Sequence, residues 1–295
     1  MPSPPAARPP GKPPRKPRKS PIKGRIRQRW TALLRGVRLR PRAGAAWRTL
    51  ASGPAALRIA CVVAVILIAL PLANIVYQVI RKPTELLFFV EGTLHKEPPE
   101  TWRQYGALFR EYSTDAITPE LLAALAQTES TGNPVARTYW RWRLTWNPFA
   151  VYKPASSAVG LFQMTDPAYA EASRHCIRRH AVVDDCWLNS FYIRALPSHA
   201  TELAAIYLDR QVTGVLASTS NTKASPRQKQ DIATLIHLCG AGPARAFARR
   251  GFQLAAGERC GDHLASAYLM KVNTMKRRFV RLAAGERDEA KAANQ

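Results

Sequence analysis

The amino-acid sequence predicts a mainly α-helical domain that follows a single membrane-spanning helix. Residues 59–80 form an uncharged run of 22 residues, which is long enough to cross a bilayer. Further along the chain, apolar side chains repeat at helical spacing in several segments, whereas the alternating pattern of strands is scarce. We therefore expect at most one small β element, near Tyr152.

These patterns divide the 295-residue chain into five parts. A basic, proline-rich tail (1–58) precedes the membrane-spanning helix (59–80), and a spacer with a packing helix (81–113) leads to the main domain (114–285). A short C-terminal tail (286–295) follows. The main domain is long enough to bury a core of its own.

The N-terminal tail carries much of the positive charge of the chain. It contains 16 of the 44 Lys and Arg residues and no Asp or Glu, and nine of the 23 prolines lie within its first 21 residues. Such a composition is typical of disordered or polyproline II segments. Its basic residues could bind anionic lipids or nucleic acid, but we favour a role in membrane orientation and expect no nucleic-acid partner.

The distribution of basic residues also predicts the orientation of the chain. An excess of Lys and Arg marks the cytoplasmic side of a membrane helix, so we expect the tail in the cytoplasm and the main domain in the periplasm, anchored to the inner membrane. A cleaved signal peptide fits less well, because 58 residues precede the apolar run and no clear small-x-small site follows it.

The cysteines agree with an oxidising compartment. Cys61 lies in the membrane span, which leaves an even number outside it. Sequence proximity favours the pairs Cys176–Cys186 and Cys239–Cys260, one of three possible connectivities. The histidines and acids around Cys176 could instead hold zinc, but their spacing matches no standard zinc pattern, so we expect no metal and no cofactor.

Two helices flank the central part of the main domain. Between Trp102 and Tyr112, aromatic and apolar residues repeat at helical spacing, which indicates a helix packed on the domain core. Ser225 is positioned to cap a second helix that begins at Pro226 and ends at Gly240. The inner face of this second helix carries Ile232, Leu235, Ile236 and Cys239.

Glu129 stands out because a carboxylate occupies a position where the helix pattern calls for a core residue. Thr118 can cap this helix, and Gly132 and Pro134 end it. Three apolar residues share one helical face with Glu129: Leu122, Leu125 and Ala126. Burial and the negative end of the helix dipole should keep its carboxyl group protonated near neutral pH, as a proton donor. The alternative is a half-exposed glutamate at a helix end.

Two motifs about thirty residues apart resemble those of the soluble lytic transglycosylase (SLT) family, which is related to the goose-type lysozymes. They are Glu129-Ser130 at the end of the predicted helix and Gly160-Leu161-Phe162-Gln163 in a later loop. The resemblance implies a lysozyme-like fold in which Glu129 is the single acid/base and Ser130 supports it. It also implies that the Gly160–Gln163 loop lines the sugar groove, with the Gln163 amide offered to the substrate and Phe162 in place of the usual Met.

Later motifs of the family match less closely. Its Ala-Tyr-Asn-Ala-Gly stretch corresponds here to Ile236-His-Leu-Cys-Gly240, in which His237 replaces the Tyr and Leu238 the Asn. The closing tyrosine of the family corresponds to Tyr268, on the inner face of a predicted helix. A hydrogen bond from Tyr268 to Glu129 and a purely structural core position are equally compatible with this pattern.

The resemblance implies cleavage of peptidoglycan glycan strands. Most glycosidases use two carboxylates, but the matched motifs contain only Glu129. A lone acid can cleave the β-1,4 bond after N-acetylmuramic acid when the substrate's acetamido group supports the anomeric carbon. Closure of a 1,6-anhydro ring then replaces hydrolysis, so the reaction is formally that of a lyase. Asp166 could be a second carboxylate, although its position before Pro167 favours a turn or an N-cap.

Other functions stay open beside this one. A hydrolytic muramidase would use Asp166 and water on the same fold, and a glycan-binding scaffold would hold the strand without cutting it. Aromatic and basic residues alternate over Tyr139–Trp146, which could stack on sugars or form a structural insert. A secretion or conjugation complex is a further candidate partner. The sequence contains no nucleophile elbow, His-Glu-x-x-His motif or phosphate-binding loop, so it gives no support to other enzyme classes.

Overall fold

The computed structural model describes residues 53–83, 85–86, 91–184, 186–219 and 223–293. Most of the expected N-terminal tail lies outside these residues, as does part of the expected spacer. The chain divides into two compact units, residues 1–68 and residues 69–295. The main domain predicted from the sequence belongs entirely to the second unit.

Helix α3 (Ala55–Arg81) contains the uncharged run. Among the described residues it is the one helix long and apolar enough to cross a membrane, by its length and composition. Its apolar side chains are mostly exposed. A helix that is apolar on every side needs an apolar environment around it, which either a protein core or a bilayer can supply.

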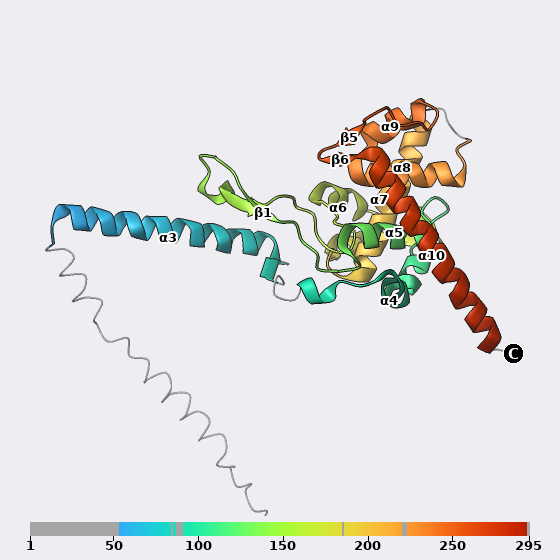
Figure 1. The fold of residues 1–295 in the computed structure, drawn as a ribbon, viewed down its shortest axis with the longest axis horizontal. Helices are drawn as coiled ribbons and strands as arrows, with labels where there is room; N and C mark the ends of the chain where they lie inside the picture. The colour runs from blue at the N-terminus through green and yellow to red at the C-terminus, as the bar shows by residue number, and fades with distance from the viewer. Residues whose placement is uncertain (1–52, 84, 87–90, 185, 220–222, 294–295) are drawn as a thin grey trace, which may run out of the picture. The chain divides into compact units, whose positions relative to one another are not determined.

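The second unit is built mainly of helices, as predicted (Figure 1). The α-helices after α3 are α4 (Pro98–Glu111), α5 (Pro119–Ser130), α6 (Asp166–Ala172), α7 (Pro197–Thr219), α8 (Pro226–Cys239), α9 (Ala241–Arg249) and α10 (Ala265–Ala293). Short 3-10 helices are η2 (Glu91–Leu94), η3 (Pro148–Ala150) and η4 (Trp187–Phe191).

Strands occur only as short antiparallel pairs among the described residues. The pair β1 (Trp140–Trp142) and β2 (Tyr152–Pro154) is the element expected near Tyr152. Two further pairs were not expected: β3 (Cys176–Arg178) with β4 (Ala181–Val183), and β5 (Arg259–Cys260) with β6 (His263–Leu264). Strands of two or three residues are too short to produce an alternating pattern, and a disulfide cysteine lies at the end of each of these pairs.

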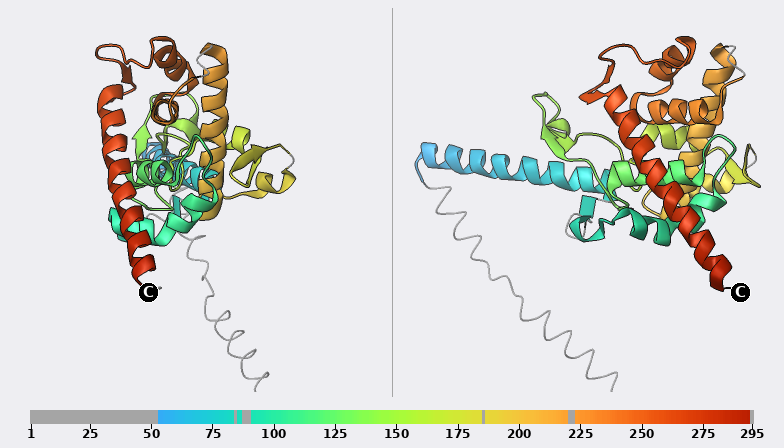
Figure 2. Two further views of the ribbon diagram at one scale, coloured as in Figure 1. Left: turned by 90° about the vertical axis from the view of Figure 1, so that its right-hand side faces the viewer. Right: turned by 45° about the vertical axis from the view of Figure 1, so that its right-hand side comes forward.

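Helix α5 lies at the centre of the domain, with α4, α7 and α10 packed around it (Figures 1 and 2). Its consecutive residues Leu121 to Ala126 are all fully buried. A helix enclosed on every side needs apolar residues all round, which explains the unbroken Leu-Leu-Ala-Ala-Leu-Ala sequence. The packing of α4 confirms the prediction of an aromatic helix against the core, because Trp102, Tyr105 and Phe109 are buried.

Helix α10 extends further than the sequence suggested. The main domain was expected to end at residue 285, yet the helix continues to Ala293. Glu286, in the expected C-terminal tail, accepts hydrogen bonds from Trp102 Nε1 and Arg110 Nη1 on α4, each at 3.0 Å. These contacts tie the last turns of α10 to α4.

Candidate active site

The end of α5 brings Glu129 to the edge of the buried core. The helix begins where predicted, because the Thr118 hydroxyl accepts a hydrogen bond from a backbone N–H of the first turn and Pro119 occupies the first helical position. It ends at Thr131, which adopts the left-handed conformation with φ 53°. The Glu129 side chain, in the last turn, is 21% exposed, so it is largely buried but still reaches the solvent.

Tyr268 donates a hydrogen bond to the Glu129 carboxylate. The tyrosine belongs to α10, the long C-terminal helix that packs along α5 (Figure 2). Burial, and then the charge and hydrogen bond of Glu129, raise the pKa of the Tyr268 hydroxyl. The hydroxyl therefore stays protonated and remains a donor to the carboxylate. Of the two positions that the sequence allowed for Tyr268, the structure has the one that contacts Glu129.

His237 is a second neighbour of Glu129 that was not predicted among the site residues. It lies in the last turn of α8, with Nε2 3.6 Å from Glu129 Oε1. The family motif contained the signal that could have identified it. His237 occupies the position of the motif tyrosine.

The pKa of Glu129 differs from the sequence-based expectation. Burial raises this pKa, as expected, but the hydrogen bond and charge of His237, the hydrogen bond of Tyr268 and the charge of Lys271 outweigh it. The net result is a pKa below the ordinary value, so the carboxyl group is ionised near neutral pH in the free protein. The expectation was wrong because His237 and Lys271 are remote in sequence and their charges could not be anticipated.

Ser130 and Gly160 join α5 to the loop of the second motif. The buried Ser130 hydroxyl lies 2.8 Å from the carbonyl oxygens of both Ala126 and Leu161. Gly160 has φ 79°, and a Cβ atom there would lie 2.2 Å from the Arg194 carbonyl oxygen. A residue with a side chain would therefore be strained and would clash with backbone. Both residues hold the loop in place rather than present polar groups to the solvent.

The other residues of the second motif divide between core and cleft. Leu161 and Phe162 are fully buried, so most of their surface belongs to the hydrophobic core. Gln163 adopts φ 46°, and its Nε2 donates hydrogen bonds to the carbonyl oxygens of Ala136 and Gly160 at 2.9 and 3.0 Å. These two bonds use both amide N–H groups, which leaves the amide oxygen of Gln163 for a ligand.

An open cleft joins the second motif to His237. Its walls come from the loop Phe162–Thr165, from α6 and α7, and from the end of α8 up to Gly240. Gln163 and His237 both line it, so the cleft connects the loop to the immediate neighbour of Glu129. Leu238, at the position of the family asparagine, packs instead against the hydrophobic core.

Asp166 lies in a different pocket. Its carboxylate forms an ion pair with Arg194 at 2.6 Å, and the pocket around it is also lined by Lys82 and Lys153. Asp166 is the first residue of α6, while Thr165 holds the N-cap position. The sequence favoured a turn or an N-cap at Asp166, but the N-cap position belongs to Thr165 and Asp166 lies one residue later, inside the helix.

The cysteines outside α3 form the two expected disulfides, Cys176–Cys186 and Cys239–Cys260. The first closes the β3–β4 hairpin, and the second joins the end of α8 to β5. Because Cys176 and Cys186 are bonded to each other, their sulfurs are not thiolate ligands for zinc. Within the described ranges, no group of three or more His, Cys, Asp or Glu side chains is arranged to hold a metal ion.

Comparison with protein families matches residues 107–225 to the transglycosylase SLT domain. The match begins within α4 and ends just before α8, so it includes Glu129 and the second motif but not His237 or Tyr268. No curated protein matches the chain. The SLT domain is lysozyme-like and is the domain of peptidoglycan lytic transglycosylases. Residues 107–225 of this chain therefore form a transglycosylase SLT domain.

Proposed function

We propose that this chain is a lytic transglycosylase, anchored in the inner membrane, that cleaves the β-1,4 bond between N-acetylmuramic acid and N-acetylglucosamine in peptidoglycan. The observation that supports this most strongly is a lone, largely buried carboxylate, Glu129, in contact with Tyr268 and His237 beside an open cleft. The SLT match of residues 107–225 supports the same class of reaction.

In this mechanism Glu129 acts first as an acid and then as a base. Its carboxyl group protonates the glycosidic oxygen as the bond to the anomeric carbon breaks, while the acetamido oxygen of the substrate supports the positive charge. The carboxylate then accepts the proton of the C6 hydroxyl, whose oxygen attacks the anomeric carbon. The product is a 1,6-anhydro-muramic acid end. Glu129 regains its proton and no water is consumed, so one carboxylate is sufficient.

The acid step needs a protonated Glu129, although the pKa of this group is lowered in the free protein. A glycan strand in the cleft would cover the exposed part of the side chain and exclude water from it. Loss of water disfavours the charged form, so substrate binding raises the pKa toward the range that the acid step requires. Tyr268 and His237 then donate to the carboxylate that the first step produces and orient it toward the C6 hydroxyl.

The second motif supplies the substrate contacts in this proposal. The Gln163 amide oxygen accepts a hydrogen bond from a sugar N–H or hydroxyl group, because its own N–H groups are already bonded to backbone. Phe162 contributes apolar wall to the cleft. Ser130, Gly160 and Leu161 act indirectly, by fixing the loop against α5.

The position of Asp166 supports ring closure over hydrolysis. A hydrolytic enzyme would need a second carboxylate that activates water on the opposite face of the sugar. Asp166 is paired with Arg194 and lines a pocket with Lys82 and Lys153, whereas the cleft beside Glu129 does not include it.

The proposed location is the periplasmic face of the inner membrane. Helix α3 can span a bilayer by its length and composition, and the basic residues before it favour a cytoplasmic N-terminus. The two disulfides support an oxidising compartment for the domain. A reporter fused after Gln295 should be active only in the periplasm, and a reporter active in the cytoplasm would contradict this topology.

Mass spectrometry of digested peptidoglycan tests the reaction itself. Purified cell walls incubated with the full chain in detergent should release fragments that end in 1,6-anhydro-muramic acid. Reducing ends would instead indicate a hydrolytic muramidase on the same fold. Binding of the glycan without any released fragment would indicate a scaffold, and either result would overturn the proposed reaction.

A further inference from the structure

The β1–β2 hairpin carries large apolar side chains that neither the core nor the cleft uses. Leu144 and Trp146, in the loop between the strands, are fully exposed (108% and 102%), and Trp142 at the end of β1 is also exposed. Hairpin loops in water normally consist of polar residues and glycine. A group of large apolar side chains in such a loop indicates a surface that contacts a partner.

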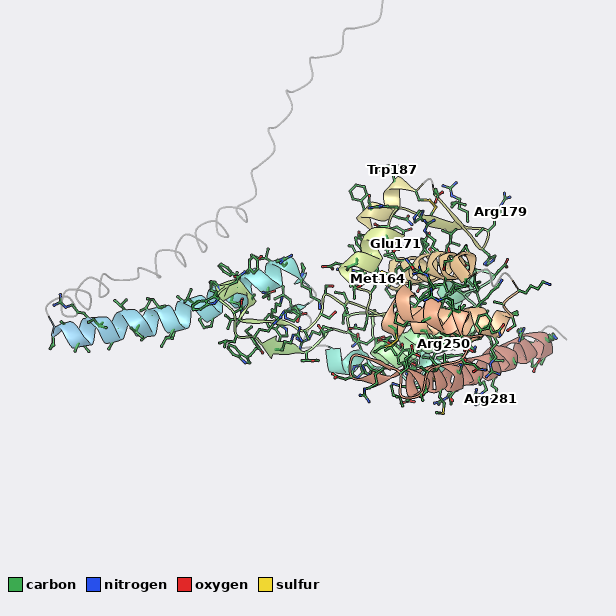
Figure 3. All side chains as sticks on the ribbon, turned by 90° about the horizontal axis from the view of Figure 1, so that it is seen from above. Met164, Glu171, Arg179, Trp187, Arg250 and Arg281 are labelled. Atoms are coloured by element: carbon green, nitrogen blue, oxygen red, sulfur yellow. A yellow bond between two sulfur atoms is a disulfide. The ribbon has the colours of Figure 1, made fainter. Side chains whose placement is uncertain are left out.

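The hairpin lies beside the C-terminal part of α3 (Figures 1 and 3). Asn74 Nδ2 of that helix donates to the Tyr152 carbonyl oxygen, and Gln78 Nε2 donates to the Phe149 carbonyl oxygen, each at 2.5 Å. The ring centroids of Tyr77 and Phe149 lie 4.9 Å apart. Asn74 and Gln78 are buried, unlike most residues of α3, because the hairpin covers them. The two amide side chains of the apolar run therefore serve to hold the hairpin.

These contacts indicate how far the hairpin extends along the apolar run. Asn74 precedes Arg81, the first charged residue after the run, by seven residues, so a rise of 1.5 Å per residue puts it about 10 Å from Arg81 along the helix axis. Half the hydrocarbon thickness of a bilayer is about 15 Å. If Arg81 marks the water boundary, the hairpin backbone at Tyr152 lies level with the hydrocarbon of one leaflet.

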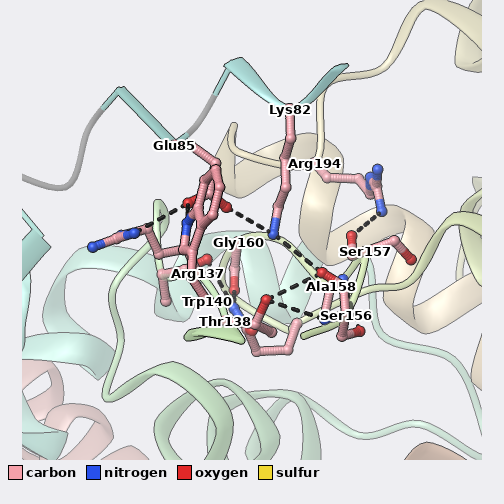
Figure 4. Close-up of polar contacts among 12 residues, drawn as sticks. Lys82, Glu85, Arg137, Thr138, Trp140, Ser156, Ser157, Ala158, Gly160 and Arg194 are labelled. Atoms are coloured by element: carbon pink, nitrogen blue, oxygen red, sulfur yellow. Dashed lines mark hydrogen bonds and ion pairs between the residues drawn. The ribbon is translucent and has the colours of Figure 1, made fainter. Parts of the chain in front are cut away.

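A buried ionic cluster attaches the base of the hairpin to the segment just after α3 (Figure 4). The Glu85 side chain is 1% exposed, and its carboxylate contacts Lys82 Nζ at 3.1 Å and Arg137 Nη1 at 3.0 Å. Trp140 Nε1, on β1, donates to the same carboxylate at 2.7 Å. A buried carboxylate needs its ion-pair and hydrogen-bond partners close by, because an unpaired buried charge is costly, so these contacts fix the positions of Lys82, Arg137 and Trp140 around Glu85. The hairpin is thus held beside α3 at two places, by the amides of Asn74 and Gln78 and by the cluster around Glu85.

The charges of the hairpin region fit an anionic surface. Between Glu129 and Asp166 the chain contains no acidic residue, whereas Arg141, Arg143 and Lys153 lie on the hairpin itself. Lys153 also lines a pocket with Arg81, Lys82 and Arg194, at the end of α3 where the headgroups would lie. Aromatic side chains combined with basic ones are typical of the membrane–water interface.

We propose that the β1–β2 hairpin is a second membrane contact, in which Trp142, Leu144 and Trp146 insert into the leaflet where α3 leaves the bilayer. Arg141, Arg143 and Lys153 contact the phosphate groups of anionic lipids at the same surface. This inference rests on the membrane anchor proposed above for α3. A domain attached to the bilayer at both the helix and the hairpin cannot swing freely, so its cleft is kept at a set height above the membrane.

Quenching of tryptophan fluorescence by brominated lipid tests this contact in the full chain. The protein is reconstituted in vesicles of phosphatidylglycerol and a phosphatidylcholine that carries bromine at acyl carbons close to the headgroup. We expect the Trp142→Phe/Trp146→Phe variant to lose roughly half of the quenching of the wild type, because interfacial indoles lie at the depth of these bromines. Trp187→Phe is the matched control, since Trp187 is also exposed but lies in η4, and it should leave the quenching unchanged.

The possible outcomes separate the hairpin contact from the anchor. Flotation of the chain with the vesicles at alkaline pH reports on α3, and a chain that stays in the soluble fraction overturns the anchor and the hairpin contact together. A chain that floats, but whose double variant is quenched as strongly as the wild type, overturns the hairpin contact alone. Circular dichroism checks that the variants are folded. Indoles shielded from aqueous acrylamide but not quenched by the lipid would identify a protein partner and would also refute the proposal.

Discussion

Tyr268 and Glu129 are separated by 139 residues in the sequence, yet the tyrosine hydroxyl donates a hydrogen bond directly to the glutamate carboxylate. The contact exists because α10 packs along α5, which places the first turns of one helix against the last turn of the other. A carboxylate at the end of a buried helix thereby gains a donor that cannot ionise near neutral pH.

Replacement of Glu129 by Gln should abolish cleavage while leaving the fold intact. The amide keeps the size of the side chain but cannot give or take a proton, so turnover of peptidoglycan should fall at least ~10²-fold. Release of soluble fragments from purified cell walls measures this. The variant should still bind the glycan, which its co-sedimentation with the cell walls measures. An E129Q variant that cuts at the wild-type rate would rule out the mechanism.

Replacement of His237 should move the pH profile of the reaction toward higher pH. His237 lowers the pKa of Glu129, and kcat/KM depends on the fraction of free enzyme in which Glu129 is protonated. Removal of the imidazole therefore raises the Glu129 pKa, so kcat/KM begins to fall at a higher pH than in the wild type. His237→Gln keeps a hydrogen-bond donor without the charge, so it should shift the profile less than His237→Phe. Identical profiles for all three proteins would exclude this role.

Tyr268→Phe should reduce both activity and stability. The variant loses a hydrogen bond to a charged group, a change that costs about 1.5–3 kcal/mol in the free energy of unfolding. Because that bond also lowers the Glu129 pKa, the pH profile should again shift upward. Tyr169→Phe is a useful control, since the Tyr169 hydroxyl lies within hydrogen-bond distance of the Ser190 and Tyr192 carbonyl oxygens and makes no contact with Glu129. It should lower the melting temperature without moving the pH profile.

Asp166→Asn should leave turnover within several-fold of the wild type. Asp166 pairs with Arg194 outside the cleft, so it takes no part in a mechanism that uses a single carboxylate. The fragments released by the variant should still carry 1,6-anhydro ends in mass spectra. A loss of several orders of magnitude would instead be the behaviour of a two-carboxylate hydrolase.

Gly160→Ala should destabilise the domain, whereas Gly214→Ala should not. An added Cβ at Gly160 would clash with the Arg194 carbonyl oxygen. The alanine would also have to adopt φ 79°, a conformation that favours glycine. Such strain costs on the order of 1–3 kcal/mol, in addition to the clash. Gly214 lies within α7 with open space around it, so alanine there should stabilise the helix by about 0.5–1 kcal/mol. The melting temperatures of the two variants measure these effects. A Gly160→Ala variant that melts at the same temperature as Gly214→Ala would show that the loop relaxes freely and would contradict the prediction.

Much of the helical framework could be predicted from the sequence, because helix ends depend on neighbouring residues. The Thr118 cap of α5 lies where it was expected. Ser225 and Gln228 form a reciprocal capping box at the start of α8, which ends at the expected Gly240. These interactions span three or four residues, so the local sequence contains all the groups that take part. The short β3–β4 and β5–β6 pairs were missed for the opposite reason, because their stability depends on disulfides and packing.

The sequence by itself determined that a carboxylate would end a buried helix, that a glycine loop would follow, and that one apolar run could cross a membrane. Only the tertiary structure decided what surrounds those features. His237 and Tyr268 reach Glu129 from α8 and α10, and together with the charge of Lys271 they reverse the direction in which burial alone would move its pKa. In the same way, the sequence gives no reason for Asn74 and Gln78 in an apolar run, whereas the structure shows that both donate hydrogen bonds to the hairpin. The physical reason is that electrostatic and hydrogen-bond energies depend on distances between atoms of segments remote in sequence, and only the packing of helices sets those distances.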